Sequence, residues 1–222
     1  MFDVSDDVLA ACRKHVGLLI KANERVNLTR IDDTESAKLL HIEDSLVGLP
    51  IVNEAPEGLY ADLGTGGGFP GIPLAIATGR DTLLVDSVAK KVKELQGFAD
   101  ELGLGNVSTY AGRIEELAIE RPGEFSLLTA RALTALPSLI ELASPLLKEG
   151  GWLVCYKSQS IEDEMEQALG IQEKVAMYLI KEDHVLLSDG ETPRTFLVFQ
   201  KKGEPTVKLP RRPGMAQKRP YK

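Results

Sequence analysis

Residues 60–73 read Tyr60-Ala61-Asp62-Leu63-Gly64-Thr65-Gly66-Gly67-Gly68-Phe69-Pro70-Gly71-Ile72-Pro73, and the rest of the chain is organised around them. A short apolar run ends in an acid, a glycine cluster follows, and two prolines open the apolar segment 74–77. This order predicts a strand, a tight loop and a helix, because glycine permits positive φ and proline suits the first helical turn. Backbone N–H groups at such a helix start face the space above the strand.

The glycines of this loop fit two classes of ligand. Gly66, Gly68 and Gly71 form the G-x-G-x-x-G pattern of dinucleotide-binding loops. The overlapping frame, Asp62-x-Gly64-x-Gly66-x-Gly68, begins with an acid and resembles the first motif of S-adenosylmethionine-dependent methyltransferases. An acid repels a pyrophosphate, but it can bind a ligand's ammonium group or hold the loop in place. An NAD-dependent oxidoreductase remains the alternative at this point.

Size and composition indicate one globular domain with a small extension. The chain has 222 residues, of which 43% are hydrophobic and 27% charged. No apolar run approaches the ~20 residues that cross a bilayer, and the acidic N-terminus does not resemble a signal peptide, so we expect a cytoplasmic protein without membrane contact. Cys12 and Cys155 fit no metal-binding spacing, so no metal is expected, and we expect Cys155 to be reduced and buried.

Charge is distributed unevenly along the chain. Residues 201–222 contain eight Lys/Arg and one acid, a net charge of +7, whereas residues 1–200 contain the other 18 basic and 32 acidic residues, a net charge of −14. A basic tail on an acidic body favours phosphate as a partner.

The chain divides into three predicted parts. Residues 1–50 form a helical N-terminal cap, with a helix over 5–27 and a second helix from Thr34 or Ser36 to about 48–50. Residues 51–202 alternate strands and helices, which predicts an α/β fold with a mostly parallel sheet and helices on both faces. Residues 203–222 are rich in Lys, Arg and Pro and should be extended or flexible.

The predicted elements of the middle part follow the apolar periodicity. The expected strands are 59–63, 82–86, 107–110, 125–129, 152–156, 174–180 and 195–201. The expected helices are 70–78, 88–102, 133–147 and 161–169, with a short helix or turn at 114–117. Ligands of such sheets bind beyond the carboxyl ends of the strands.

Candidate binding residues lie at these strand ends. Asp86 ends the second strand, 22 residues after Gly64, where an acid can accept hydrogen bonds from ribose hydroxyls of either S-adenosylmethionine or NAD. Ile114 and Glu115 follow the third strand, where the adenine lies in a methyltransferase arrangement. Arg131 closes the fourth strand, which faces the reacting methyl group in that arrangement.

The residues around Arg131 restrict the chemistry. The Asn/Asp-Pro-Pro-Tyr/Phe sequence of many amine methyltransferases is absent, and neither cysteine is placed to attack a pyrimidine. Arginine is a poor base, but it binds phosphates and pairs with the O6 and N7 edge of guanine. Guanine N7 has a free lone pair, so its methylation needs placement rather than proton removal.

Several motifs together resemble one family, the bacterial small-subunit ribosomal RNA guanine-N7 methyltransferases, also called glucose-inhibited division protein B. The matching segments are Asn27-Leu28-Thr29, His41-Ile42-Glu43-Asp44-Ser45-Leu46, the glycine loop through Pro73, Leu84-Val85-Asp86-Ser87-x-x-Lys90-Lys91, Ala130-Arg131-Ala132 and Lys157. The chain departs from the family at Glu43, and its basic tail is typical of only some members.

The resemblance implies a Rossmann-like class I fold that transfers a methyl group from S-adenosylmethionine to N7 of a guanine in 16S ribosomal RNA. Arg131 would lie between cofactor and base as a positioning residue, and no general base is expected. Motif and resemblance together assign these cofactor contacts: Asp62, Gly64, Gly66, Gly68, Phe69, Asp86, Ile114, Glu115 and Arg131.

The expected partner is the ribosomal RNA of the small subunit. Its predicted contacts are Lys157, Arg211, Arg212, Lys218 and Arg219. The acidic body disfavours tight binding to naked RNA, so we expect an assembled or partly assembled particle to be the substrate. Two alternatives remain: an NAD-dependent oxidoreductase, which lacks a visible Tyr-x-x-x-Lys or His/Asp proton relay, and a non-catalytic RNA-binding or ribosome assembly factor on the same fold.

Overall fold

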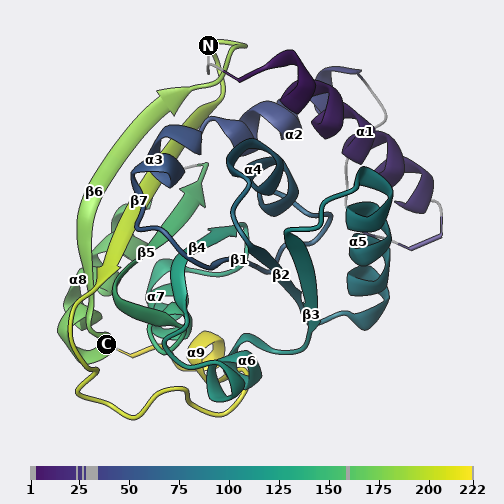
Figure 1. Ribbon diagram of the computed structural model, residues 1–222. Coiled ribbons are helices and arrows are strands. Elements are labelled where there is room, and N and C mark those ends of the chain that lie inside the picture. The colour runs from purple at the N-terminus through teal and green to yellow at the C-terminus, as the bar shows by residue number, and fades with distance from the viewer. Residues whose placement is uncertain (1–3, 24, 27, 29–34, 159–160, 222) are drawn as a thin grey trace.

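The computed structural model describes residues 4–23, 25–26, 28, 35–158 and 161–221. They form one seven-stranded sheet in the order β3-β2-β1-β4-β5-β7-β6, with helices on both faces (Figure 1). The strands are β1 (Tyr60–Leu63), β2 (Thr82–Asp86), β3 (Val107–Ala111), β4 (Phe125–Arg131), β5 (Leu147–Lys157), β6 (Met177–Leu186) and β7 (Pro193–Lys201). The helices are α1 (Asp6–Asn23), α2 (Glu35–Leu46), α3 (Leu49–Glu54), α4 (Gly71–Thr78), α5 (Ala89–Leu102), α6 (Ile114–Glu120), α7 (Leu136–Ala143), α8 (Glu162–Val175) and α9 (Met215–Lys218).

The sheet is parallel from β3 to β5, and only β7 runs antiparallel to its neighbours β5 and β6. The predicted α/β architecture with a mostly parallel sheet is therefore confirmed. The strand order reverses between β1 and β4, and sheets of this kind bind ligands in the crevice at such a point.

Alternate residues of the central strands pack on opposite faces of the sheet. Leu63 and Val85 belong to an apolar cluster with α6, α7 and α8. Leu84 faces the other way and packs with α1, α4 and α5. This double burial explains the nearly continuous apolar sequence of β1 and β2. Among the described residues, no helix is both long and apolar enough to cross a membrane.

The helical N-terminal part of the chain extends further than the sequence predicted. Pro50 was expected to end the second helix, but it lies in the first turn of a further helix, α3, so the helical segment continues to Glu54. Proline can open a helix as readily as it ends one, because it lacks only an N–H that the first turn leaves unpaired. Asn27, Thr29 and Thr34 lie outside the described residues.

Several boundaries in the second half were also predicted incorrectly. Helix α7 ends at Ala143 rather than at residue 147, β5 begins at Leu147 rather than at residue 152, and β6 continues to Leu186 rather than to residue 180. Helix α7 begins at Leu136 rather than at residue 133, since Pro137 fits the first helical turn but not the second. Helix α8 continues to Val175 and ends at Ala176, which has a left-handed backbone, so β6 begins at Met177 rather than at residue 174.

The C-terminal segment, residues 203–221, differs most from its prediction as an extended or flexible tail. In Figure 1 it returns beneath the sheet, and α9 lies beside α6 and α7. Arg211 forms two hydrogen bonds of 2.6 Å with the buried carboxylate of Glu141. Ser138 Oγ donates to the Ala216 carbonyl at 2.8 Å. These anchors come from α7, about 70 residues earlier in the chain, so the local composition could not predict them.

Candidate active site

The glycine loop between β1 and α4 adopts the backbone that its glycines permit. Gly64, Gly66 and Gly68 have φ values of 68°, 58° and 91°, in the left-handed region that favours glycine. A Cβ on Gly64 would lie 2.5 Å from Leu133 Cδ1, so this position also requires a close approach. His15 of α1 supports the loop, with Nε2 3.0 Å from the Gly67 carbonyl oxygen.

Asp62 holds this loop from below. Its carboxylate is fully buried and accepts hydrogen bonds from Gly71 N–H at 3.0 Å and from Thr129 Oγ at 2.7 Å. Burial raises the pKa of Asp62 from 3.8 to about 6, and its hydrogen bonds, including these two, oppose that rise. Of the two roles that the sequence left open, this geometry favours fixing the loop over direct contact with a ligand's ammonium group.

The raised pKa of Asp62 predicts a pH-dependent contribution to stability. Between pH 3.8 and about 6 the folded state binds a proton that the unfolded state releases, so this group lowers stability as pH rises through that window. Asp62→Asn removes this titration. The stability advantage of the wild type over Asp62→Asn should therefore be about 1 kcal/mol larger at pH 5 than at pH 8, measured by urea unfolding. An equal advantage at both pH values would contradict the raised pKa.

A first pocket, the cofactor pocket, lies above the carboxyl ends of β1, β2, β3 and β4. Its lining residues are Gly64, Val85, Asp86, Ser87, Gly112, Arg113, Ile114, Glu115, Ala132, Leu133, Leu142 and Gln217. Its volume of about 170 Å³ is below the ~300–1,000 Å³ of typical ligand sites. A ligand as large as an adenosine derivative would therefore extend from it into neighbouring space.

Asp86 is placed to bind hydroxyl groups in this pocket. Its two oxygens accept hydrogen bonds from Gly66 N–H at 3.2 Å and Val88 N–H at 2.9 Å. A carboxylate oxygen accepts more than one hydrogen bond, so both retain capacity for a ribose. The backbone bonds hold the carboxylate at the pocket, which fits an adenosine-containing cofactor.

The loop backbone distinguishes the two candidate cofactors. A phosphate-binding loop directs its N–H groups at the ligand. Here Gly64 and Thr65 both donate to the Val85 carbonyl, at 2.9 and 3.0 Å, and Gly68 and Phe69 both donate to the Thr65 carbonyl. The N–H groups of Gly66 and Gly71 donate to the carboxylates of Asp86 and Asp62. Because these backbone donors already have partners within the protein, the loop is poorly suited to bind a pyrophosphate, which disfavours NAD as the cofactor.

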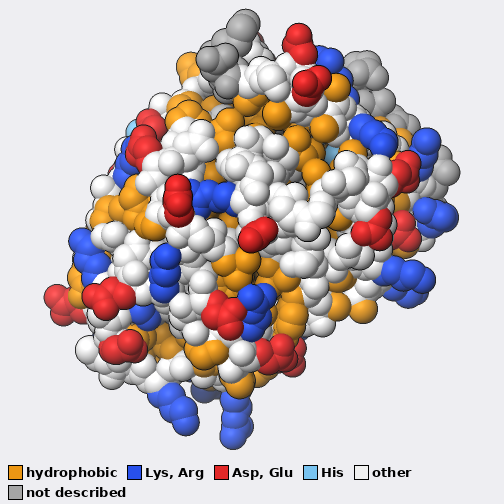
Figure 2. All heavy atoms as spheres, viewed as in Figure 1, with side chains coloured by type: hydrophobic (Ala, Val, Ile, Leu, Met, Phe, Trp, Pro, Cys, Tyr) orange, Lys and Arg blue, Asp and Glu red, His pale blue; other side chains and the backbone are white. Residues whose placement is uncertain are grey.

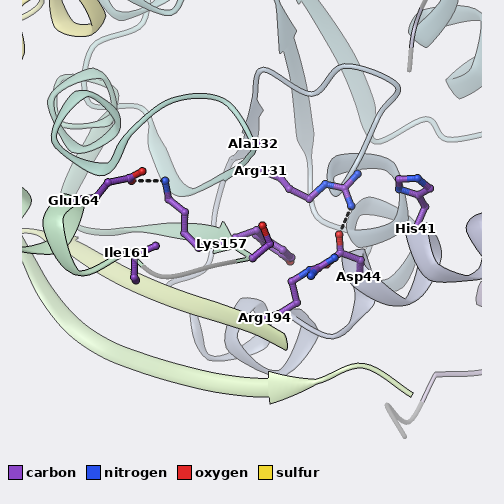
Figure 3. A pocket seen from close by; sticks show the side chains of 10 residues that line it. His41, Asp44, Arg131, Ala132, Lys157, Ile161, Glu164 and Arg194 are labelled. Carbon is purple, nitrogen blue, oxygen red and sulfur yellow. Dashed lines mark hydrogen bonds and ion pairs between the residues drawn. The ribbon is translucent and has the colours of Figure 1, made fainter. Parts of the chain in front are cut away.

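A second pocket, the acceptor pocket, is drawn in Figure 3. It shares the lining residue Ala132 with the cofactor pocket. It has a volume of about 520 Å³ and opens beyond the carboxyl ends of β4 and β5. Its lining residues are His41, Asp44, Arg131, Ala132, Tyr156, Lys157, Ser158, Ile161, Glu164 and Arg194. Ala132 has a φ of 52°, so the chain turns sharply where the pockets meet.

Arg131 and Arg194 enclose Asp44 in the acceptor pocket, as Figure 3 shows. Arg131 Nη1 lies 2.6 Å from Asp44 Oδ2, and Arg194 Nε pairs with Asp44 Oδ1. The three side chains are between 8 and 18% exposed, so the cluster carries one net positive charge in a largely buried setting. Arg131 also lies 5.5 Å from the centre of the Phe69 ring, which connects the acceptor pocket to the glycine loop.

The other titratable groups of the acceptor pocket are also constrained. Lys157 Nζ lies 2.7 Å from Glu164 Oε2, which also accepts a hydrogen bond from Leu136 N–H. Burial, together with the nearby Arg131, lowers the pKa of His41, so its imidazole is neutral at pH 7. Both carboxylates that line the pocket are therefore paired with cations.

The predicted site residues separate into three groups. Gly64, Asp86, Ile114 and Glu115 line the cofactor pocket, and Arg131 and Lys157 line the acceptor pocket. Asp62, Gly66, Gly68 and Phe69 line neither pocket and instead shape the loop.

The residues predicted to bind RNA are placed unequally. Arg212, Lys218 and Arg219 are exposed, whereas Arg211 directs its guanidinium at Glu141 and lies 4.1 Å from the Tyr221 ring. Arg211 therefore has partners within the fold, and its role as an RNA contact stays a prediction.

Sequence reasoning missed Arg194 and Gln217. Arg194 reaches the acceptor pocket because β7 runs antiparallel to β5, which brings the start of β7 to the carboxyl end of β5. Gln217 reaches the cofactor pocket through the folded C-terminal segment. Neither lies in a recognisable motif.

Comparison with solved structures defines the class. The fold is similar to an O-methyltransferase from Bacillus cereus in complex with SAH, with a TM-score of 0.58, 15% identity and coverage of 85% of this chain and 91% of that one. It is also similar to cofactor-bound Rv0187 from MTB, with a TM-score of 0.60, 17% identity and coverage of 90% and 92%. The protein thus has the predicted Rossmann-like class I methyltransferase fold.

Sequence comparison then identifies the family. Residues 9–190 match the family model GidB, described as rRNA small subunit methyltransferase G. The chain is 31% identical to ribosomal RNA small subunit methyltransferase G of Alkaliphilus metalliredigens, over 100% of this chain and 94% of the relative. It is 38% identical to the protein of the same name from Deinococcus radiodurans, and the match covers 92% of this chain and 82% of that relative. The chain belongs to the rRNA small subunit methyltransferase G family.

Proposed function

We propose that this enzyme transfers the methyl group of S-adenosylmethionine to N7 of a guanine in 16S ribosomal RNA. The observation that carries the proposal is the junction of the two pockets at Ala132. The cofactor pocket offers Asp86 to a ribose, and the acceptor pocket offers a cationic wall to a nucleotide. S-adenosylmethionine would supply an electrophilic methyl group at that junction.

The acceptor pocket suits a base that needs no proton removal. Asp44 and Glu164 are both held by cations, so neither is a free general base. The two cysteines are fully buried, and burial raises the pKa of each thiol to about 12, so neither serves as a nucleophile. Arg131 would donate to guanine O6 and leave the N7 lone pair free to attack. Rate enhancement then comes from placement of base and methyl group.

The proposed substrate is a small subunit that is assembled at least in part. Figure 2 shows acidic and basic side chains interspersed over one face, with basic side chains projecting from the lower edge, where Figure 1 draws the C-terminal segment. Arg212, Lys218 and Arg219 are the exposed basic side chains of this segment that would meet phosphate. An acidic body gains little from naked RNA, so ribosomal proteins or folded RNA would supply further contacts.

The test is methyl transfer from labelled S-adenosylmethionine to unmodified small subunits and to protein-free 16S RNA. Borohydride–aniline cleavage then maps N7-methylguanine. We expect one cleavage site and faster transfer to the particle. Binding of S-adenosylmethionine without cleavage would point to another methyl acceptor, and binding without any methyl transfer would favour an assembly factor.

A further inference from the structure

The C-terminal segment contributes a side chain to the cofactor pocket, although its sequence suggested only a basic tail. Gln217 lies in α9 and lines the pocket with Gly112, Ile114 and Glu115, the residues that follow β3. The residues that follow β3 mark the end of the pocket farthest in the sheet order from β4, which bears Arg131, and the hydrogen bond from Gly214 N–H to Glu115 brings the C-terminal segment to that end. A ligand that places its ribose at Asp86 and its methyl group near Ala132 must direct its base toward this end.

The segment is held in place by several independent contacts. Gly214 N–H donates to Glu115 Oε1 at 2.7 Å, so the segment fixes the orientation of a carboxylate that lines the pocket. Ala216 is buried in the main apolar cluster. The bidentate pair of Arg211 with the buried Glu141 is the strongest anchor, because both groups are charged and largely withdrawn from water.

The chemistry of Gln217 matches an adenine edge. A carboxamide offers one acceptor and two donors, and adenine presents an amino donor beside a ring-nitrogen acceptor. Gln217 is exposed in this structure, so its amide is accessible to a ligand entering the pocket. A basic residue at this point would lack the acceptor that the adenine amino group needs.

We propose that residues 211–221 form the adenine-facing wall of the cofactor site, with Gln217 as the residue that reads the 6-amino group. This inference rests on S-adenosylmethionine being the cofactor, as proposed above. It assigns to the segment a role in holding the cofactor, in addition to any contact with RNA.

The first test measures cofactor affinity by isothermal titration calorimetry on the full chain. The probes are S-adenosylhomocysteine and its inosine analogue, in which oxygen replaces the 6-amino group. We expect Gln217→Ala to raise the Kd for S-adenosylhomocysteine about 10-fold, since a bidentate amide contact with adenine contributes about 1–3 kcal/mol. The preference for the adenine form over the inosine form should fall by a similar factor, which a purely structural role would not produce.

Gln167→Ala is the matched control, because Gln167 is an exposed glutamine on α8 that lines neither pocket. Its Kd values should stay within twofold of the wild type. Unchanged affinity and unchanged preference in Gln217→Ala would overturn the proposal. Failure of the wild type to bind S-adenosylhomocysteine at all would instead refute the proposed cofactor.

A second test needs no substitution. Trypsin can cleave after Lys208, Arg211 and Lys218 in the C-terminal segment, whereas Arg212 and Arg219 precede prolines. Saturating S-adenosylhomocysteine should slow cleavage at these sites several-fold, because a ligand bound against the segment favours its packed state. Cleavage rates that do not respond to the ligand would count against the segment as a wall of the site.

Discussion

Arg131→Ala is expected to lower kcat/KM for methyl transfer to the small subunit by about 100-fold or more, equivalent to about 3 kcal/mol of transition-state stabilisation. Arg131 lies at the carboxyl end of β4, lines the acceptor pocket and adjoins Ala132, where the pockets meet. Its loss removes the donor proposed for guanine O6 and leaves Asp44 paired with Arg194 alone. The variant should fold, with a stability loss of about 1–2 kcal/mol, because Asp44 retains one cation.

The conservative variant separates charge from shape. Arg131→Lys keeps the positive charge but loses the planar fork, so we expect activity between the wild type and Arg131→Ala. Arg25→Ala serves as the control, because Arg25 is 70% exposed and lies outside both pockets. Activity losses that merely followed the unfolded fraction would assign Arg131 a structural role. Steady-state kinetics with thermal unfolding of each variant distinguish these outcomes.

The sequence predicted the centre of the fold and half of the site because the signals there are local. Gly64, Gly66 and Gly68 all adopt positive φ angles within one short loop, so a few neighbouring residues are enough to predict that loop. Asp86 ends a strand whose apolar pattern is continuous. Parallel strands bring such ends to one edge of the sheet, so Gly64, Asp86 and Glu115 could be placed together without a structure.

The rest depends on contacts between distant residues. Arg194 joins the acceptor pocket through the antiparallel pairing of β7 with β5, which its neighbours in sequence do not reveal. The C-terminal segment is held by contacts with distant residues, among them the buried carboxylate of Glu141, 70 residues before Arg211, and the hydroxyl of Ser138. Composition correctly described the segment as basic, but these long-range contacts, which composition does not reveal, hold it against α6 and α7.

This arrangement also affects how RNA binding is to be tested. Deleting residues 203–222 would remove Gln217 and the partner of Glu141 together with the exposed charges, so lost activity would have several causes. Substituting Arg212, Lys218 and Arg219 with glutamine removes exposed charge alone. The triple variant should bind the particle with a shallower salt dependence, since each phosphate contact contributes about one unit of slope. An unchanged slope in a filter-binding titration would exclude these side chains from the docking surface.

Asp86→Ala should weaken binding of S-adenosylmethionine about 100-fold or more while leaving the fold intact. Asp86 has two separable tasks: its oxygens accept from Gly66 and Val88 N–H groups, and they face the pocket where a ribose would donate two hydroxyls. Hydrogen bonds to a charged group contribute about 1.5–3 kcal/mol each, so losing two of them accounts for the factor. Asp86→Asn keeps one oxygen as acceptor and should lose less.

Asp81→Ala is the matched control for Asp86→Ala, because Asp81 is an exposed acid just before the opposite end of β2. Its Kd by isothermal titration calorimetry should equal that of the wild type. If Asp86→Ala bound S-adenosylmethionine normally, the ribose would lie elsewhere, and the assignment of the pocket to adenosine would fail. If it bound weakly and also melted at a much lower temperature, the backbone bonds to the loop would be the dominant task. The expected result, weak binding with a nearly unchanged Tm, follows only if the carboxylate contacts the ligand directly.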